Sequence, residues 1–416
     1  MSPVSVLHCA PVVLPITSEP IADGAVAVAG DRIAAVGPRE ELQSLYADAR
    51  VRAWRGVLTP GLVNAHTHLE FTDFADLATT GMPFHEWIRE LIARKQTFTP
   101  SMWLESARRG VHQLLKAGTT CVADVVTNGP GLIPPAATGL SGISYVEMTG
   151  IDERRYQADL ERMLDVLESA PPGRPIGISP HAPYSMGTEV LRRLGVLARE
   201  RGMRLHPHAA ETQQEVEYVG TGGGPFAESN VRFGLELELQ GCGCGLSPVG
   251  FLDSVGLLGP DVHVAHGVHV DEVDRKTLRE KGTAVALCPR SNAILDAGSA
   301  PVAAYLAEGN VFGVGTDSSA SAPTLDVLDD VRTLRDLARE QGYDSDDLDE
   351  RLVMAATVGG ATAIGLPDVG RLEPGARADL AVFDVPTDAD PYKTLVESGA
   401  GRCIATVLAG RMVHRR

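Results

Sequence analysis

The 416-residue chain has few cysteines and no long apolar run. Its six cysteines form no regular framework, and a chain of this length needs no disulfides to fold, so we expect a reducing compartment. No apolar stretch reaches the roughly 18 residues that cross a bilayer. The N-terminus also lacks the basic region of a signal peptide. These absences predict a cytoplasmic location.

Basic residues are also scarce, since 37 Lys and Arg face 54 Asp and Glu and the net charge is −17. The long-range field of such a chain repels nucleic acid and anionic membranes, so we expect neither as a partner. A small molecule feels only the local site and is not excluded. Hydrophobic residues make up 44% of the chain, which is enough for a large core.

Short apolar segments alternate with helical patterns through most of the chain. A parallel (β/α)₈ barrel needs roughly 250 residues and has this alternation, so we predict an α/β barrel of this type over residues 58–368. The strands are expected near residues 58–65, 119–125, 142–148, 175–180, 203–208, 262–266, 283–288 and 311–316. The clearest helices are expected at residues 101–116, 156–167, 189–200, 271–280 and 324–340.

The two ends of the chain have a different sequence pattern, which indicates short strands with alternating polarity and tight turns. Neither residues 1–57 nor residues 369–416 are numerous enough for a good core alone. We therefore expect them to form one small β-sandwich domain together, with the barrel inserted between them. Residues 220–247 show no clear period, and we expect a long loop there, on the face of the barrel where active sites lie.

Polar residues end four of the expected barrel strands. His66 and His68 are two apart in a strand, so their side chains project to the same side and form half of a metal site. The fifth strand ends in His206 and His208, which share the same parity and compete for the next ligand position. His266 ends the sixth strand and Asp317 follows the eighth. These side chains are expected at the carboxyl ends of the strands, where barrel enzymes carry their chemistry.

Four segments resemble the amidohydrolase superfamily in its branch of aromatic-base and nucleoside deaminases. They are PGLVNAHTHLE (60–70), HPHAAET (206–212), AHGVH (265–269) and GTDSSAS (315–321), in that order. The resemblance extends to the terminal ADLAVFD and VLAGRMV segments and so covers nearly the whole chain. It implies a metal-dependent aminohydrolase with the metal ligands His66, His68, His208 and Asp317. The HxxE pattern of the family selects His208 over His206, because Glu211 follows it by three residues.

Three histidines and one aspartate suit Zn²⁺, and Fe²⁺ would accept the same donors. Such a metal lowers the pKa of water toward neutrality. The resemblance then assigns catalytic roles to three residues. Asp317 takes a proton from the attacking water, Glu211 protonates a ring nitrogen of the substrate, and His266 orients the attacking group.

The expected fourth strand, residues 175–180, has no lysine. Relatives with two metals commonly bridge them with a modified lysine on this strand, so the resemblance implies a single divalent metal. His181 follows the strand directly and is expected to contact the substrate.

Further substrate contacts are expected from the segment after the first strand and from two other residues. The Phe84-His85-Glu86-Trp87 element resembles one in which Glu86 would contact ribose hydroxyls and Trp87 would line the pocket, although an ordinary amphipathic helix fits equally well. Glu70 is expected either at the substrate or as a partner of a metal histidine. Arg290 is expected either at an anionic group of the substrate, with Arg94 as an alternative, or in a salt bridge with a loop carboxylate.

The order of HTHLEF and PFHEWI is similar to that in the aminodeoxyfutalosine deaminases of menaquinone biosynthesis, which implies a small purine nucleoside as the substrate. Three alternatives remain open at this point: a general adenosine, methylthioadenosine or S-adenosylhomocysteine deaminase, an enzyme for guanine, cytosine or triazines, and a non-catalytic scaffold. A homo-oligomer is compatible with the resemblance, because related enzymes are often dimers or tetramers.

Overall fold

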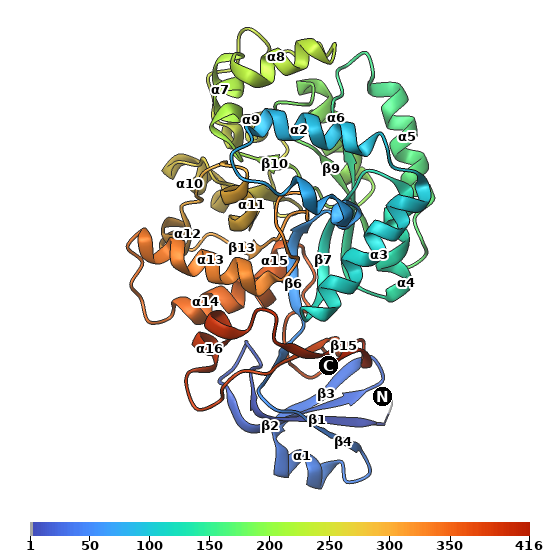
Figure 1. Ribbon diagram of the computed structural model, residues 1–416, viewed down its shortest axis with the longest axis vertical. Helices are drawn as coiled ribbons and strands as arrows, with labels where there is room; N and C mark the ends of the chain where they lie inside the picture. Colours follow the sequence, from blue (N-terminus) through green and yellow to red (C-terminus); the bar gives the residue numbers. More distant parts are fainter. Residues whose placement is uncertain (1–2) are drawn as a thin grey trace.

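The computed structural model describes residues 3–416 and consists of a barrel and a smaller sheet that contains both ends of the chain (Figure 1). In the barrel, the eight strands run parallel and form two sheets of four. Parallel bridges at Ile178–Leu205 and Thr67–Asp317 connect the sheets and close the barrel. The predicted fold class is therefore confirmed. The strands are β6 (Leu62–Thr67), β7 (Thr119–Val126), β8 (Ser141–Met148), β9 (Ile176–Pro180), β10 (His208–Ala209), β11 (His263–His266), β12 (Ala284–Leu287) and β13 (Phe312–Val314).

Amphipathic helices cover the outside of the barrel, and the five predicted ones are present. They are α3 (Pro100–Lys116), α5 (Tyr156–Glu168), α6 (Thr188–Glu200), α10 (Glu272–Lys281) and α13 (Val327–Glu340). Helix α3 shows why the sequence forms them: Thr99 caps its first turn, Pro100 occupies the first helical position, and Ala107, Val111 and Leu114 face the core. None of the helices within residues 3–416 combines the length and the apolarity that crossing a membrane requires.

Shorter helical segments connect these elements. They are η1 (Leu69–Leu77), α2 (Phe84–Lys95), η2 (Gly129–Leu132), α4 (Ile133–Thr138), α7 (Gln213–Thr221), α8 (Gly224–Arg232), α9 (Pro248–Ser254), α11 (Pro289–Ile294), α12 (Val302–Glu308), α14 (Leu348–Met354), η3 (Ala355–Gly359) and α15 (Gly360–Ala363). The expected long loop over residues 220–247 is wrong in its first half, because α8 occupies it. Helix α8 is short and packs against α7 and α2, and a local pattern does not reveal these contacts.

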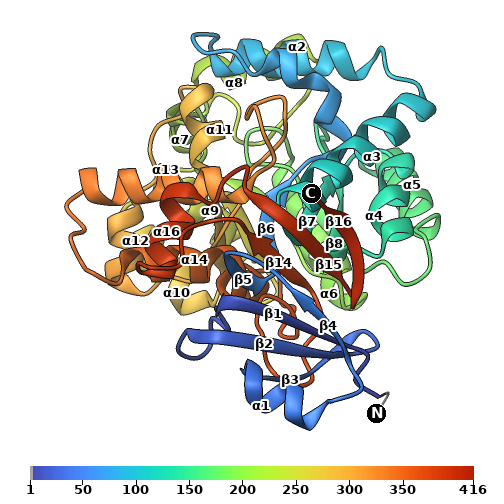
Figure 2. The same cartoon turned by 60° about the horizontal axis from the view of Figure 1, so that its bottom comes forward.

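The two chain ends form one continuous eight-stranded sheet (Figure 2). Its order is β16-β15-β14-β5-β1-β2-β3, and β4 pairs with β1. The strands are β1 (Val6–Val13), β2 (Ile21–Ala29), β3 (Arg32–Pro38), β4 (Arg50–Ala53), β5 (Val57–Pro60), β14 (Leu380–Phe383), β15 (Cys403–Leu408) and β16 (Arg411–Arg415), accompanied by α1 (Arg39–Leu45) and α16 (Pro391–Ser398). Residues of both ends share one apolar core, which includes Val26, Leu58 and Leu380.

The expected first barrel strand, residues 58–65, is divided between the two sheets. Strand β5 pairs with β1 and β14, whereas β6 begins the barrel after Gly61. The Gly61 N–H donates to the carbonyl of Asp379 and the Leu62 N–H donates to that of Gly118, so the chain changes sheets at this point. Because residues 58–65 form one continuous apolar run, the sequence pattern does not indicate which sheet each residue joins.

Close packing of β13 against β6 generates a test of this architecture. A Cβ added at Gly315 would lie 2.8 Å from the Cβ of His66 and 2.8 Å from the sulfur of Cys288. We predict that Gly315→Ala lowers the free energy of unfolding by about 1–3 kcal/mol, because overpacking forces the strands apart. Denaturant unfolding measures this change. In Gly220→Ala, where nothing lies within 4 Å of the added carbon, the unfolding midpoint is expected to stay at or above that of the wild type. An unchanged midpoint for Gly315→Ala would contradict the packing.

Candidate active site

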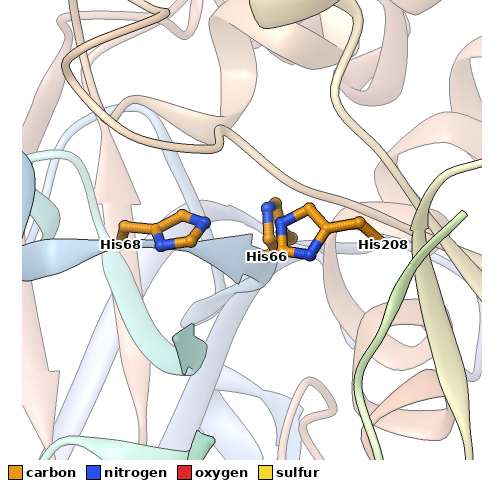
Figure 3. Close-up of side chains that lie close together, drawn as sticks. All are labelled: His66, His68 and His208. Carbon is orange, nitrogen blue, oxygen red and sulfur yellow. The ribbon is translucent and has the colours of Figure 1, made fainter. Parts of the chain in front are cut away.

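Three histidines meet at the carboxyl ends of the barrel strands. His66 lies in β6, His68 directly follows that strand, and His208 begins β10; one nitrogen of each lies within 4.8 Å of the others. All three side chains are buried. Figure 3 shows His68 and His208 directed toward each other on either side of His66. The structure thus brings together the three histidines that the motifs select.

His206 lies behind His66 and sets its protonation. The Nδ1 of His206 lies 2.7 Å from the carbonyl oxygen of His263, which can only accept, so this nitrogen carries a proton. Burial lowers the pKa of His206 and keeps the ring neutral, which leaves its Nε2 as an acceptor. That atom lies 2.7 Å from Nδ1 of His66, which therefore donates. In the neutral ring this tautomer leaves Nε2 of His66 without a proton, and that atom has no hydrogen-bond partner among residues 3–416. This is the state of a metal ligand.

His208 is oriented in the same manner. Its Nδ1 lies 3.2 Å from the carbonyl oxygen of His181 and donates to it, so its Nε2 is unprotonated and faces the site. Burial, followed by the neighbouring imidazoles, lowers the pKa of His208 and of His68, which keeps both rings neutral. Neutral imidazoles can bind a cation without first losing a proton.

Asp317 completes the group from the end of the eighth strand. One carboxylate oxygen lies 3.5 Å from Nε2 of His66 and 3.6 Å from Nε2 of His68. The other accepts hydrogen bonds from the hydroxyls of Ser291 (2.7 Å) and Ser321 (2.9 Å). Burial alone would raise the pKa of Asp317, but the neighbouring imidazoles of His66, His68 and His266 outweigh it and lower the pKa. The group is therefore an anion.

The backbone is strained where the strands reach this site. Ala210, His266 and Asp317 have φ values of 53°, 74° and 56°, although none of them is glycine. The left-handed conformation costs such residues about 1–2 kcal/mol each, and strain of this kind gathers at functional sites. Here it follows β10, β11 and β13 and turns the side chains at their ends toward one another.

Glu211 and His266 form a second pair beside the histidines. The Oε1 of Glu211 lies 3.5 Å from Nε2 of His266, whose Nδ1 lies 3.0 Å from the amide oxygen of Asn292. Burial raises the pKa of Glu211 well above its usual value, and the charges of Asp317 and Glu215 raise it further. A carboxyl group in this environment holds its proton more tightly than a free carboxyl group does, and it can act as a proton donor.

Two connected cavities lie in front of these residues. The inner cavity has a volume of about 100 Å³, and the residues that line it include His68, His208, Glu211, His266 and Asp317, together with Trp87 and Glu147. The outer cavity has a volume of about 580 Å³ and extends along α2 and α8. The two share six lining residues: Ile88, Ile92, Lys95, Thr149, His181 and Tyr184. A ligand with one end at the histidines therefore has room to continue outward.

Two of the expected substrate residues line these cavities. His181 lies at the junction, its Nδ1 is 2.8 Å from the hydroxyl of Ser185, and burial lowers its pKa to about 3. Trp87 lines the inner cavity, and its indole N–H donates to the carbonyl of Ala320. Glu86, one residue earlier on α2, lines neither cavity.

Glu70 and Arg290 lie away from both cavities. Glu70 is buried and accepts hydrogen bonds from the backbone N–H groups of Thr127 and Asn128, so it holds the loop after β7. Arg290 binds Asp330, with nitrogen–oxygen distances of 2.6 and 3.0 Å, so it forms a salt bridge, although with a carboxylate of helix α13 and not of a loop. Arg94 is likewise bound to Asp76 on the surface.

Two charged residues of the inner cavity wall were missed from the sequence, Glu147 and Lys95. Glu147 ends β8, is only 5% exposed, and its Oε1 has no hydrogen-bond partner among residues 3–416. One of its oxygens lies within 4.8 Å of ring nitrogens of His181 and His208, and burial raises its pKa to about 7. The signal was present, because a carboxylate in the apolar strand SGISYVEM occupies the same strand end as the histidines. Lys95 looks like an ordinary last-turn lysine in the sequence of α2.

Comparison with known proteins identifies the class. Residues 57–413 match the amidohydrolase family, and residues 24–49 match an imidazolonepropionase-like composite domain of bacteria. The family match spans most of the chain and contains every histidine of the site, so the chain belongs to the amidohydrolase family. The resemblance inferred from the motifs is confirmed, as is the expectation of a hydrolytic enzyme.

Individual relatives act on nucleosides. The chain is 34% identical over 352 residues to a 5-methylthioadenosine/S-adenosylhomocysteine deaminase of Haloarcula marismortui, with 82% of this chain and 76% of that protein covered. It is 32% identical over 357 residues to an aminodeoxyfutalosine deaminase of Deinococcus radiodurans, with 82% and 81% covered. An adenosine deaminase structure from Xanthomonas campestris with bound zinc superposes with a TM-score of 0.82 at 25% identity, covering 100% of this chain and 94% of that one.

The histidine geometry generates a test of metal binding. We predict that the double variant His66→Ala with His68→Ala loses its bound divalent metal and its activity together, because two of the converging nitrogens are removed. Metal per chain, measured by elemental analysis of the purified protein, checks this. His269→Ala serves as the control, since this histidine bonds a backbone carbonyl outside the site and the variant is expected to keep its metal. Full occupancy in the double variant would disprove the assignment.

Proposed function

We propose that this enzyme hydrolytically deaminates the six-position of an adenine nucleoside with the help of one divalent metal ion. The observation that carries the proposal is the convergence of His66, His68, His208 and Asp317 beside the Glu211–His266 pair. A protonated carboxyl next to a cation site can protonate a ring nitrogen while water attacks the adjacent carbon. This combination suits deamination of an aromatic ring better than hydrolysis of an ordinary amide.

The residues present fit the metal. The free Nε2 of His66 and the unprotonated Nε2 of His208 are buried donors that need a positive partner, and Asp317 supplies the negative charge. We propose Zn²⁺, with Fe²⁺ as the alternative that the same donors would accept. When bound, the ion supplies a Lewis acid that makes water more acidic. No lysine is present on β9, which favours a single ion.

The reaction then divides among three side chains. Asp317 accepts a proton from the attacking water as its oxygen bonds to the ring carbon. Glu211 donates its proton to the neighbouring ring nitrogen, which makes that carbon electrophilic. His266, held by Asn292, orients the attacking oxygen. When the carbon–nitrogen bond breaks, the amine leaves as ammonia with the proton returned from Asp317. The hydroxyl left on the ring carbon loses its proton to Glu211 as it becomes the carbonyl of the product, which restores the protonated Glu211.

For the substrate we propose 6-amino-6-deoxyfutalosine, which would be converted to futalosine in menaquinone biosynthesis. The similarity to the Deinococcus enzyme supports this substrate, as does the outer cavity, which extends well beyond a purine. The Haloarcula relative supports the second candidate, a deaminase of methylthioadenosine and S-adenosylhomocysteine. On either reading His181 and Glu211 hold the purine and Trp87 closes the inner cavity over it.

The role of Glu211 can be tested without disturbing the metal. We predict that Glu211→Gln lowers kcat by about 10²–10⁴-fold with the metal retained, because the amide keeps the shape but cannot transfer a proton. Steady-state kinetics combined with metal analysis checks this. Glu217→Gln, a matched change at an exposed position of α7, is expected to leave kcat unchanged. Near-normal turnover of Glu211→Gln would reject proton transfer by this residue.

A substrate panel separates the two candidates. We predict that kcat/KM is higher for 6-amino-6-deoxyfutalosine than for adenosine, methylthioadenosine or S-adenosylhomocysteine, since specificity follows differential binding of the transition state. Ammonia release and loss of the adenine absorbance measure each reaction. More efficient turnover of any of the other three nucleosides would move the assignment to the second candidate. Activity restricted to guanine, cytosine or a triazine would reject an adenine nucleoside altogether.

A further inference from the structure

A third carboxyl group lines the inner cavity and has no part in the proposed reaction. Asp317, Glu211 and Glu147 all belong to the cavity wall, and the first two transfer protons. Glu147 is buried, and its Oε1 has no hydrogen-bond partner in the part of the chain that the structure describes. A buried carboxylate without a donor is costly, so such a group at a cavity wall calls for a ligand that supplies hydrogen-bond donors.

The position of Glu147 follows from the alternation of β8. Tyr145, two residues earlier, faces the barrel interior, where its ring lies 5.1 Å from that of His206 and 5.4 Å from that of His263. Residues two apart in a strand project to the same side. Glu147 therefore also faces the interior, but one layer nearer the carboxyl ends of the strands, where it lines the inner cavity.

Glu147 lies beside the reacting centre. One of its oxygens lies within 4.8 Å of ring nitrogens of His181 and His208, and His208 is a proposed metal ligand. A cation held by the neighbouring histidines favours the ionised form of Glu147, which can only accept hydrogen bonds. Glu147 lines only the inner cavity, whereas the residues shared with the outer cavity come from α2 and from the segments after β8 and β9.

An adenine nucleoside carries hydrogen-bond donors in only two places, the amine at the six-position and the hydroxyls of the ribose. The unsubstituted ring nitrogens are acceptors. The ribose is attached at the other end of the purine from the amine, so it lies toward the outer cavity when the amine faces the histidines. The amine is therefore the donor that can meet a carboxylate confined to the inner cavity.

We propose that Glu147 accepts a hydrogen bond from the amine that is displaced and holds it as it leaves. The inference rests on the proposed deamination and adds the residue that recognises the leaving group. Before cleavage the amine nitrogen takes a proton from Asp317 and becomes positively charged, so its N–H groups become stronger donors. As the carbon–nitrogen bond breaks, its electron pair stays on nitrogen and ammonia forms, while Glu147 neither gains nor loses a proton. The hydrogen bond is thus stronger in the transition state than in the bound substrate, which raises kcat.

A pair of substrates that differ only in the leaving group tests this role. One is the 6-amino nucleoside that the wild-type holoenzyme turns over best, and the other is its 6-chloro analogue, whose leaving group has no hydrogen to donate. We expect Glu147→Gln and Glu147→Met to lower kcat for the 6-amino substrate by about 10–100-fold. For the 6-chloro analogue, kcat/KM is expected to stay within about twofold or to rise, because a carboxylate repels a departing chloride. Metal per chain is expected to stay unchanged in both variants.

Glu90→Gln is the matched control, because Glu90 is an exposed carboxylate of α2 that lines neither cavity, and both substrates should react as with the wild type. If the wild type does not displace chloride, the inhibition constant of the 6-chloro analogue replaces its kcat/KM in the comparison, and it is expected to stay within about twofold or to fall.

Three results would overturn the role of Glu147 and leave the deaminase proposal standing. An unchanged kcat for the 6-amino substrate would show that no bond to the amine matters. Equal losses for the two substrates would show that Glu147 acts only through structure. Loss of metal from Glu147→Gln would make the residue a metal ligand instead. Failure of the wild type to turn over any 6-amino purine nucleoside would reject the proposed function itself.

Discussion

The closure of the barrel between its first and last strands is the constraint on which the site depends. The N–H groups of Thr316 and Asp317 both donate to the carbonyl of His66, at 3.1 and 3.0 Å. The side chain of Asn64 reinforces the seam, because its amide donates to the hydroxyl of Thr316 and its oxygen accepts from the backbone of the same residue. These bonds join segments about 250 positions apart in sequence and set Asp317 beside His66 and His68. Without closure of the barrel, the proposed ligands would lie apart, at the ends of three separate strands.

Hydrogen bonds behind the site explain why a buried cluster of histidines is stable. A neutral imidazole placed in a core needs partners for its polar atoms, and here the chain from the carbonyl of His263 through His206 to His66 supplies them in one direction. Each ring donates to the acceptor behind it, so the last unprotonated nitrogen, Nε2 of His66, faces the other residues of the metal site. These two hydrogen bonds also fix the tautomer of His66, the proposed metal ligand. Residues that hydrogen-bond to a metal ligand commonly orient it in this way.

The sequence predicted the repeating architecture well because strand and helix periods are local. It also predicted which residues converge, since His66, His208, His266 and Asp317 each follow an apolar strand and parallel strands end on one face. It failed where the outcome depends on distant contacts. The division between β5 and β6 and the helix α8 are set by packing partners that lie elsewhere in the chain.

The charged residues follow a rule that the sequence alone could not show. Several charges of the scaffold are paired or hydrogen-bonded within the protein, as with Arg290 and Asp330, Arg94 and Asp76, and Glu70 with the backbone after β7. Charges of the cavity walls, such as Glu147 and Lys95, have no ion pair within residues 3–416. An unpaired group at a cavity wall raises the energy of the empty protein, because burial removes water without supplying a partner. A ligand that supplies the partner recovers that energy on binding. The residue types do not distinguish the two groups, since both contain a basic residue and a glutamate. What distinguishes them is pairing: Arg290, Arg94 and Glu70 are bonded within the protein, whereas Glu147 and Lys95 have no ion pair within residues 3–416 and line a cavity.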